Sequence, residues 1–184
     1  KRVLAIPRVK RKNAMVDATS SGAHASFSNR DFRDVMGRFA TGVAIVTTRA
    51  AAGAPVGMTV NSFSAVSLSP PLVLFCIDRG ATCYDAFAAA DFFAVNILRE
   101  DQQAISDVFA NGDGDRFAGL AVDRWETGAP ILTAGLAAMD CQIHDRHDGG
   151  DHEILVGRVL RLSTGAAAAP LVYFGGRYQA LAAD

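Results

Sequence analysis

Cysteine is scarce in this sequence, and the cysteines that are present do not form a recognisable set. Cys76, Cys83 and Cys141 are an odd number without metal-binding or redox spacing, which argues against a disulfide framework. Cys76 lies within an apolar run, where a free thiol behaves as a small hydrophobic residue. Because free thiols persist in reducing compartments, we expect a cytoplasmic protein.

Long apolar runs and an excess of charge of either sign are also missing. No stretch reaches the roughly 18–20 consecutive apolar residues of a membrane-spanning helix. The net charge is −1, which gives no electrostatic attraction to nucleic acid or to an anionic membrane. We therefore expect neither as a partner. With 184 residues, half of them hydrophobic, the chain is long enough for one domain with a sizeable core.

The first 26 residues differ in composition from the rest. Residues 1–14 are basic and precede Met15, and their apolar part is too short for a signal peptide. We interpret them as a cloning remnant or the product of an early start codon, with a basic targeting segment as the alternative. Residues 15–26 are rich in Ser, Ala and Gly and are typical of a flexible lead-in. We expect residues 1–26 to be disordered and residues 27–184 to form the folded domain.

A helix is predicted at the start of this domain. Ser28 is placed to cap it, with Asp31 three residues later in its first turn. Four apolar residues then recur at helical spacing and are expected to lie in the core: Phe32, Val35, Met36 and Phe39.

Beyond Gly42 the pattern changes to short β-branched and apolar runs. Strands are predicted at 43–48, 56–61, 65–68, 72–77, 92–98, 132–144, 152–163 and 171–174, and short helices at 82–90 and 101–110. Many strands joined by short turns favour a closed antiparallel barrel. No Gly-x-Gly-x-x-Gly follows the first strand, so a doubly wound dinucleotide-binding fold is disfavoured.

Small polar residues gather in segment 57–84, between and after two of these strands. Hydroxyl and amide groups at strand ends suit the carbonyls of a flat heterocycle, and Arg79 and Thr82 before a short helix suit a phosphate. The alternative is a serine-rich hairpin whose hydroxyls only satisfy turn backbone. The residues in question include Thr59, Asn61, Ser62, Ser64, Ser67 and Ser69.

A second polar cluster contains three histidines and three aspartates within nine residues, 144–152. Such residue types can ligate a metal, but their spacing matches no compact metal motif and Gly149 and Gly150 interrupt it. We interpret His144 and His147 as part of a solvated hairpin loop and expect no metal site. No Gly-x-Ser-x-Gly motif is present to support acyl transfer.

Three segments together resemble a known family. FATGVAIVTT (39–48), GMTVNSFSAVSLSPPLVLFCIDR (57–79) and GDHEILVGRV (150–159) occur in this order, and they resemble the FMN-binding split-barrel flavin reductases that serve two-component flavin-dependent monooxygenases. The resemblance covers about 32–178. It implies a closed antiparallel split β-barrel and a homodimer. It also implies an NAD(P)H:flavin oxidoreductase that transfers a hydride from NADH or NADPH to FMN or FAD and supplies reduced flavin to a separate oxygenase.

The resemblance also implies site residues. Thr59, Asn61, Ser62 and Ser67 would hold the flavin ring and ribityl chain, and Arg79 and Thr82 its phosphate. Ala81 stands where a Ser is expected, so one hydroxyl contact to the phosphate is missing. Arg116 reaches the phosphate or pairs with Asp113 or Asp115. The full flavin-binding set is Met58, Thr59, Val60, Asn61, Ser62, Ser67, Cys76, Arg79, Ala81, Thr82 and Arg116.

For the nicotinamide, the resemblance places His152 of the Gly-Asp-His motif beside the reacting ring. Phe174 and Tyr178, which flank Gly175 and Gly176 near the carboxyl terminus, are candidates to shape the pocket. The alternatives are a cross-strand surface histidine and aromatic residues that merely close the barrel. Hydride transfer between stacked rings needs positioning more than a strong base, so His152 is the one catalytic candidate. Two rival functions share these features: a retained flavin that reduces a corrin or ferric complex, and a non-enzymatic flavin-binding electron carrier.

Overall fold

The fold consists mainly of antiparallel strands with few helices. The computed structural model describes residues 27–112 and 114–181, so the disorder expected for residues 1–26 concerns a segment outside the described residues. Seven strands form one sheet in the order β3-β2-β6-β9-β10-β5-β4. These strands are β2 (Ala44–Arg49), β3 (Pro55–Val60), β4 (Ser64–Leu68), β5 (Pro71–Asp78), β6 (Phe92–Ile97), β9 (Ala137–Gly149) and β10 (His152–Thr164). The expected mainly-β fold class is confirmed.

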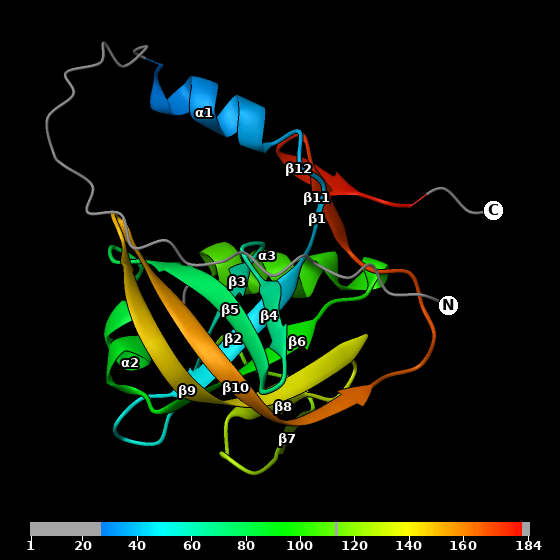
Figure 1. The fold of residues 1–184 in the computed structure, drawn as a ribbon. Coiled ribbons are helices and arrows are strands. Elements are labelled where there is room, and N and C mark those ends of the chain that lie inside the picture. Colours follow the sequence, from blue (N-terminus) through cyan, green and yellow to red (C-terminus); the bar gives the residue numbers. More distant parts are fainter. Residues whose placement is uncertain (1–26, 113, 182–184) are drawn as a thin grey trace, which may run out of the picture.

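Smaller elements surround this sheet (Figure 1). A three-stranded sheet has the order β1-β11-β12, and β7 pairs with β8. The bounds of these strands are β1 (Thr41–Gly42), β7 (Val122–Arg124), β8 (Pro130–Leu132), β11 (Val172–Phe174) and β12 (Arg177–Gln179). The helical segments are α1 (Asn29–Met36), α2 (Tyr84–Ala89), a 3-10 turn (Glu100–Gln102) and α3 (Gln103–Asn111).

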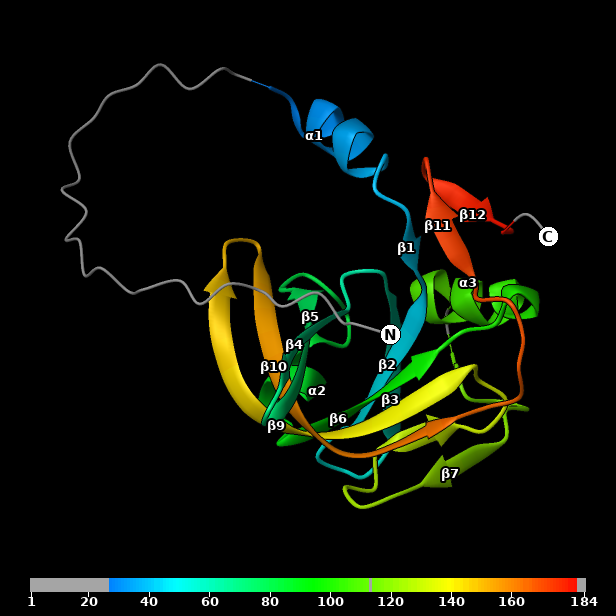
Figure 2. The same cartoon turned by 45° about the vertical axis from the view of Figure 1, so that its right-hand side comes forward.

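The large sheet curls so strongly that its two ends face each other, as Figure 2 shows. Strands β3 and β4 are the ends of the sheet order, and among the described strands they are not paired with each other. Closure of the barrel therefore stays a prediction. One side chain links the connection between them to the sheet: Ser62 Oγ accepts from the Cys76 N–H at 3.0 Å and donates to the Cys76 carbonyl at 3.1 Å.

The main core lies inside this curl because the strands alternate in burial. In β5, Val73, Phe75 and Ile77 are buried while their neighbours are not, as expected for a strand with one face on a core. Phe75 meets the rings of Phe87 and Phe93 edge-on, with centroids 5.7 and 5.0 Å apart. This aromatic cluster joins β5, α2 and β6.

Gly157 lies at a register shift in β10 and allows this cluster to pack closely. A Cβ at this position would lie 2.4 Å from the Phe93 ring, and the shift falls between Val156 and Gly157. Any side chain here would displace the ring or bend the strand. The glycine is thus required by close approach.

Buried polar groups attach β8 to the sheet. Asn96 is fully buried; its Nδ2 donates to the Ile45 carbonyl at 3.1 Å, and its Oδ1 accepts from the Leu132 N–H at 2.8 Å. Thr47 Oγ1 donates to the Pro130 carbonyl at 2.5 Å. Because each bond satisfies a group that would be costly to bury alone, this network fixes where β8 lies.

The histidine-rich segment differs from the expected loop. Strand β9 continues to Gly149 and pairs with β10, and the turn is confined to the hairpin tip, where Gly150 has a φ of +77°. His144 and His147 therefore lie on a strand. The expected strand at 132–144 is also two elements, since β8 ends at Leu132 and β9 begins at Ala137.

Helix α1 begins where the sequence predicts, but its apolar stripe is not in the core. Ser28 and Asp31 form the expected capping box, with Ser28 N–H to Asp31 Oδ2 at 2.8 Å. The helix stands away from the large sheet (Figures 1 and 2) and buries none of its residues. The core prediction is therefore wrong for these apolar residues, which are 52–70 % exposed: Phe32, Val35, Met36 and Phe39.

Candidate functional site

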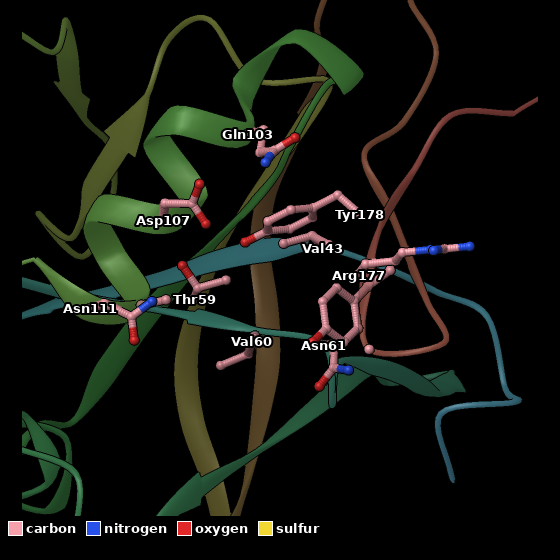
Figure 3. A pocket seen from close by; sticks show the side chains of 12 residues that line it. Val43, Thr59, Val60, Asn61, Gln103, Asp107, Asn111, Arg177 and Tyr178 are labelled. Atoms are coloured by element: carbon pink, nitrogen blue, oxygen red, sulfur yellow. The ribbon is translucent and has the colours of Figure 1, made fainter. Parts of the chain in front are cut away.

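Three hollows follow one another along β3 and the connection that leaves it. The central hollow has a volume of about 600 Å³ and lies between β3, α3 and the β11–β12 hairpin (Figure 3). Its lining mixes polar and apolar side chains, and two of the polar ones, Asp107 and Arg177, are charged. The lining residues include Val43, Thr59, Val60, Asn61, Gln103, Asp107, Asn111, Arg177 and Tyr178.

Tyr178 is held at the wall of this central hollow by neighbouring side chains. Its hydroxyl lies 2.8 Å from Ser106 Oγ, and its ring meets Tyr173 edge-on at 5.5 Å. Thr59 Oγ1 donates to the Ser106 carbonyl at 2.6 Å, which joins β3 to α3. Burial raises the pKa of the Tyr178 phenol, and the nearby Asp107 carboxylate raises it further. The phenol is therefore neutral at physiological pH and can both donate and accept.

The second hollow has a volume of about 960 Å³ and adjoins the start of β3. Gly57, Thr82, Cys83 and Arg116 are among the residues that line it. Arg116 Nη1 donates to the Gly57 carbonyl at 3.0 Å, and Nε donates to the Gly112 carbonyl at 3.1 Å. The sequence left two alternatives for Arg116, a phosphate contact or a pair with Asp113 or Asp115. In the structure Arg116 binds backbone carbonyls and not Asp115, and Asp113 lies outside the described residues.

The third hollow, of about 650 Å³, is mainly apolar and follows β3 on the other side. It shares Val43 and Asn61 with the central hollow, and its apolar wall comes from Met36, Phe39, Phe63 and Ile97. Along β3 the lining thus changes from a hollow that holds Arg116 together with Asp85 and Asp115, through one with hydroxyl and amide groups beside Asp107 and Arg177, to an apolar surface.

A separate polar cluster forms at the tip of the β9–β10 hairpin. His152 pairs with Asp78 across the β10–β5 ladder, and the Arg79 N–H donates to the Asp151 carbonyl at 3.0 Å. His152 Nδ1 lies 2.8 Å from Asp151 Oδ1. This hydrogen bond holds the pKa of the Asp151 carboxyl below its usual range. The Gly-Asp-His segment and the end of segment 57–84 are therefore in direct contact.

The structure brings together part of the predicted flavin set. Thr59, Val60 and Asn61 line the central hollow, Asn61 and Ser62 the third, and Thr82 and Arg116 the second. The other predicted residues lie outside these hollows. Met58 contacts the core, with its Sδ 3.6 Å from Cys83 Sγ, and Ala81 packs against the same core cluster. Ser67 lies on β4 and Cys76 on β5.

The predicted nicotinamide residues are not brought to one place in this chain. Tyr178 lines the central hollow, whereas His152 lies at the hairpin tip and Phe174 is exposed at the end of β11. Sequence reasoning also missed polar residues on α3. Gln103, Asp107 and Asn111 face the central hollow (Figure 3), and their i, i+4, i+8 spacing on one helix face was the available signal.

Buried thiols contribute no reactive group to these hollows. Cys141 is fully buried, and its pKa is raised to about 12, first by burial and then by the Asp140 carboxylate. Burial also raises the pKa of Cys83. Both are therefore protonated at neutral pH, and a thiolate nucleophile is not available from them.

Among the described helices, none has the length and apolar character needed to cross a bilayer.

The sequence and the fold were compared with those of known proteins. Residues 36–182 match the family described as flavin reductase like domain. The reductase subunit HsaB of a flavin-dependent monooxygenase from Rhodococcus jostii (strain RHA1) is 42 % identical over 172 residues, covering 92 % of this chain and 88 % of that protein.

Two solved structures share the fold. The nitrilotriacetate monooxygenase component B homolog from Mycobacterium thermoresistibile has a TM-score of 0.79 and 43 % identity, covering 83 % of this chain and 86 % of that one. The NADH:FAD oxidoreductase SgcE6 from Streptomyces globisporus, in complex with NAD and FAD fragments, has a TM-score of 0.79 and 37 % identity, covering 85 % of this chain and 94 % of that one. The chain therefore belongs to the flavin reductase-like domain family, and its activity is that of a flavin reductase.

Proposed function

We propose that residues 27–184 form one reductase domain that binds FMN or FAD along β3 and reduces it with NADH or NADPH. The order of surroundings along β3 is the observation that carries this proposal. A flavin has a flat ring, a neutral ribityl chain and an anionic phosphate. The apolar hollow, the central hollow with the Thr59, Asn61 and Tyr178 side chains, and the hollow with Arg116 occur in the same order. The residues therefore fit the cofactor.

In this arrangement, Thr59, Asn61, Ser62 and Ser67 hold the ring and ribityl chain. Val60 lines the same wall, Met58 supports it from the core, and the Cys76 backbone holds Ser62 in place through two hydrogen bonds. A bound flavin supplies a hydride acceptor at its ring nitrogen. The protein orients the two rings and excludes water, because hydride transfer depends on alignment and not on a strong base.

At the phosphate end, Thr82 and Arg116 face the same hollow. Ala81 precedes Thr82 and offers no hydroxyl, so the side-chain contacts come from Thr82 and the two arginines. Arg79 lies three residues before Thr82, although its guanidinium points to the hairpin tip. For the nicotinamide we propose His152, Phe174 and Tyr178.

Turnover assays test the proposed reaction. NADH and NADPH oxidation is measured with FMN, FAD and riboflavin as acceptors, and we expect rapid turnover with at least one pair. A protein that purifies with flavin bound but oxidises neither nucleotide when flavin is added would instead be an electron carrier. Turnover that requires a corrin or ferric complex would favour the retained-flavin alternative.

Paired variants test the flavin site itself. Asn61→Ala removes an amide shared by the central and apolar hollows, and we expect several-fold weaker flavin binding because one hydrogen bond is worth about 0.5–1.5 kcal/mol. Thr133→Ala is the control, since Thr133 Oγ1 donates to the Ala121 carbonyl and the residue lines none of the three hollows. Fluorescence quenching gives both dissociation constants. Equal affinity in the two variants would place the ring elsewhere.

We also propose that reduced flavin leaves for a separate oxygenase and that the protein is a cytoplasmic homodimer. The name of HsaB, a reductase subunit of a monooxygenase, supports the first point. The free cysteines support the reducing compartment. The exposed apolar stripe of α1 supports the dimer, because exposed patches of this kind mark association surfaces.

A further inference from the structure

The Arg79 side chain is 41 % exposed and is bound by two other side chains in this structure. Its Nη1 donates to the Tyr84 hydroxyl at 2.9 Å, and its Nη2 donates to Asp148 Oδ1 at 2.9 Å. The guanidinium also lies over the Tyr84 ring, 5.9 Å from its centroid. Tyr84 packs against the main core, so one side of the guanidinium has a fixed support.

The partner on the other side is easily displaced. The Asp148 side chain is 82 % exposed and comes from the tip of the β9–β10 hairpin. An exposed ion pair contributes little stability, because water solvates both charges well. A guanidinium binds carboxylate and phosphate oxygens with the same N–H geometry. The carboxylate therefore occupies a position that a phosphate can take.

We propose that Asp148 competes with the flavin phosphate for Arg79 and so weakens the binding of phosphorylated flavins. This inference rests on the proposed role of segment 79–82 at the phosphate. When no flavin is bound, Asp148 holds the Arg79 guanidinium at the hairpin tip. When flavin binds, its phosphate must displace the Asp148 carboxylate from Arg79. The Arg79–Asp148 pair forms again when the flavin leaves.

This competition has two measurable consequences. In the wild type, binding breaks the weak, exposed Arg79–Asp148 pair and forms the contact with the phosphate, so the gain from that contact is reduced by the worth of the pair that breaks. Without the Asp148 charge, binding adds an ion pair and affinity becomes greater. Because exposed ion pairs are screened by salt, the dissociation constant for FMN should also depend more steeply on salt in that variant.

Asp148→Asn tests the proposal, since it removes the charge and keeps the shape. We expect FMN to bind about two- to fivefold more tightly, the range of an exposed ion pair, and riboflavin, which has no phosphate, to bind as before. Asp145→Asn is the matched control. Asp145 lies on the same strand and pairs with His147 at 3.3 Å, so it changes the hairpin charge equally without releasing Arg79.

Arg79→Ala alone and combined with Asp148→Asn completes the test. FMN should bind about tenfold more weakly to Arg79→Ala, and adding Asp148→Asn should bring no gain. If Arg79→Ala weakens FMN but Asp148→Asn has no effect, or if riboflavin or Asp145→Asn shows the same gain, the competition is disproved and the phosphate role of Arg79 stands. If Arg79→Ala leaves FMN binding unchanged, the phosphate role fails and the competition fails with it.

Discussion

His152 is the side chain that we propose for catalysis. Its ring is oriented by Asp151 at 2.8 Å and is only partly exposed. The sequence implied that the nicotinamide-facing and flavin-facing segments are separate. The structure joins them instead, because the Arg79 N–H binds the Asp151 carbonyl. A change at His152 must therefore be tested on both ligands.

We predict that His152→Ala raises the Michaelis constant for NADH or slows flavin reduction, and leaves the flavin dissociation constant nearly unchanged. The reason is that a misplaced hydride donor can cost about a hundredfold in rate, whereas the flavin contacts that we propose come from segment 57–84 and Arg116 and not from the His152 ring. Stopped-flow reduction and fluorescence quenching separate the two effects. His147→Ala is the control, because His147 lies on the same hairpin and pairs with Asp145. A loss of flavin affinity with normal reduction of bound flavin would contradict the role of His152.

Among the strands, β10 depends most on one small residue. We predict that Gly157→Ala lowers the free energy of unfolding by about 1–3 kcal/mol, because overpacking a close contact has this cost. The added Cβ would lie 2.4 Å from the Phe93 ring. Chemical denaturation measures the change.

Gly53→Ala separates this crowding from the general effect of replacing a glycine. Gly53 has a positive φ of 82°, and a Cβ added there would have no other atom within 4 Å, so its cost is backbone strain without crowding. If Gly157→Ala costs no more than an exposed glycine replacement, the packing argument is wrong.

Much of the strand pattern follows from the sequence, because alternating apolar residues report which face is buried. The alternation in β5 and the capping box at Ser28 are local signals, and both predict the observed elements. No such local signal predicts strand β7 or the extension of β9 to Gly149. Polar residues form these strands because neighbouring strands supply the hydrogen bonds, and tertiary pairing overrides local preference.

The candidate site also divides into residues that local sequence signals predict and residues that only tertiary packing brings there. Segment 57–62 was found from its residue types, since hydroxyls and amides cluster at the end of a predicted strand. Gln103, Asp107 and Asn111 were not, because only the packing of α3 against β3 turns that helix face to the central hollow. The apolar stripe of α1 was misassigned to the core because helical periodicity identifies an apolar face but not what covers it.

The exposed face of α1 leads to a prediction about assembly. Val35→Glu places a charge in the middle of the apolar stripe, and we expect it to shift the protein from dimer to monomer because burying an unpaired charge is costly. Light scattering after size-exclusion chromatography measures the mass. Arg30→Glu is the control, since Arg30 lies on the same helix and its side chain is 91 % exposed in a loose pair with Asp34. A wild-type monomer, or equal dissociation in both variants, would contradict a dimer built on this face.

The small sheet β1-β11-β12 joins the two ends of the described chain. Thr41 pairs with Tyr173, and the Gly175 N–H donates to the Gly37 carbonyl at 2.8 Å, directly after α1. The same hairpin carries Arg177 and Tyr178 to the central hollow. Proteolytic trimming before residue 171 would therefore remove the support of the first helix and one wall of the ligand site in a single cut. Strands β11 and β12 thus connect the helix that we propose as the dimer surface to one wall of the candidate ligand site.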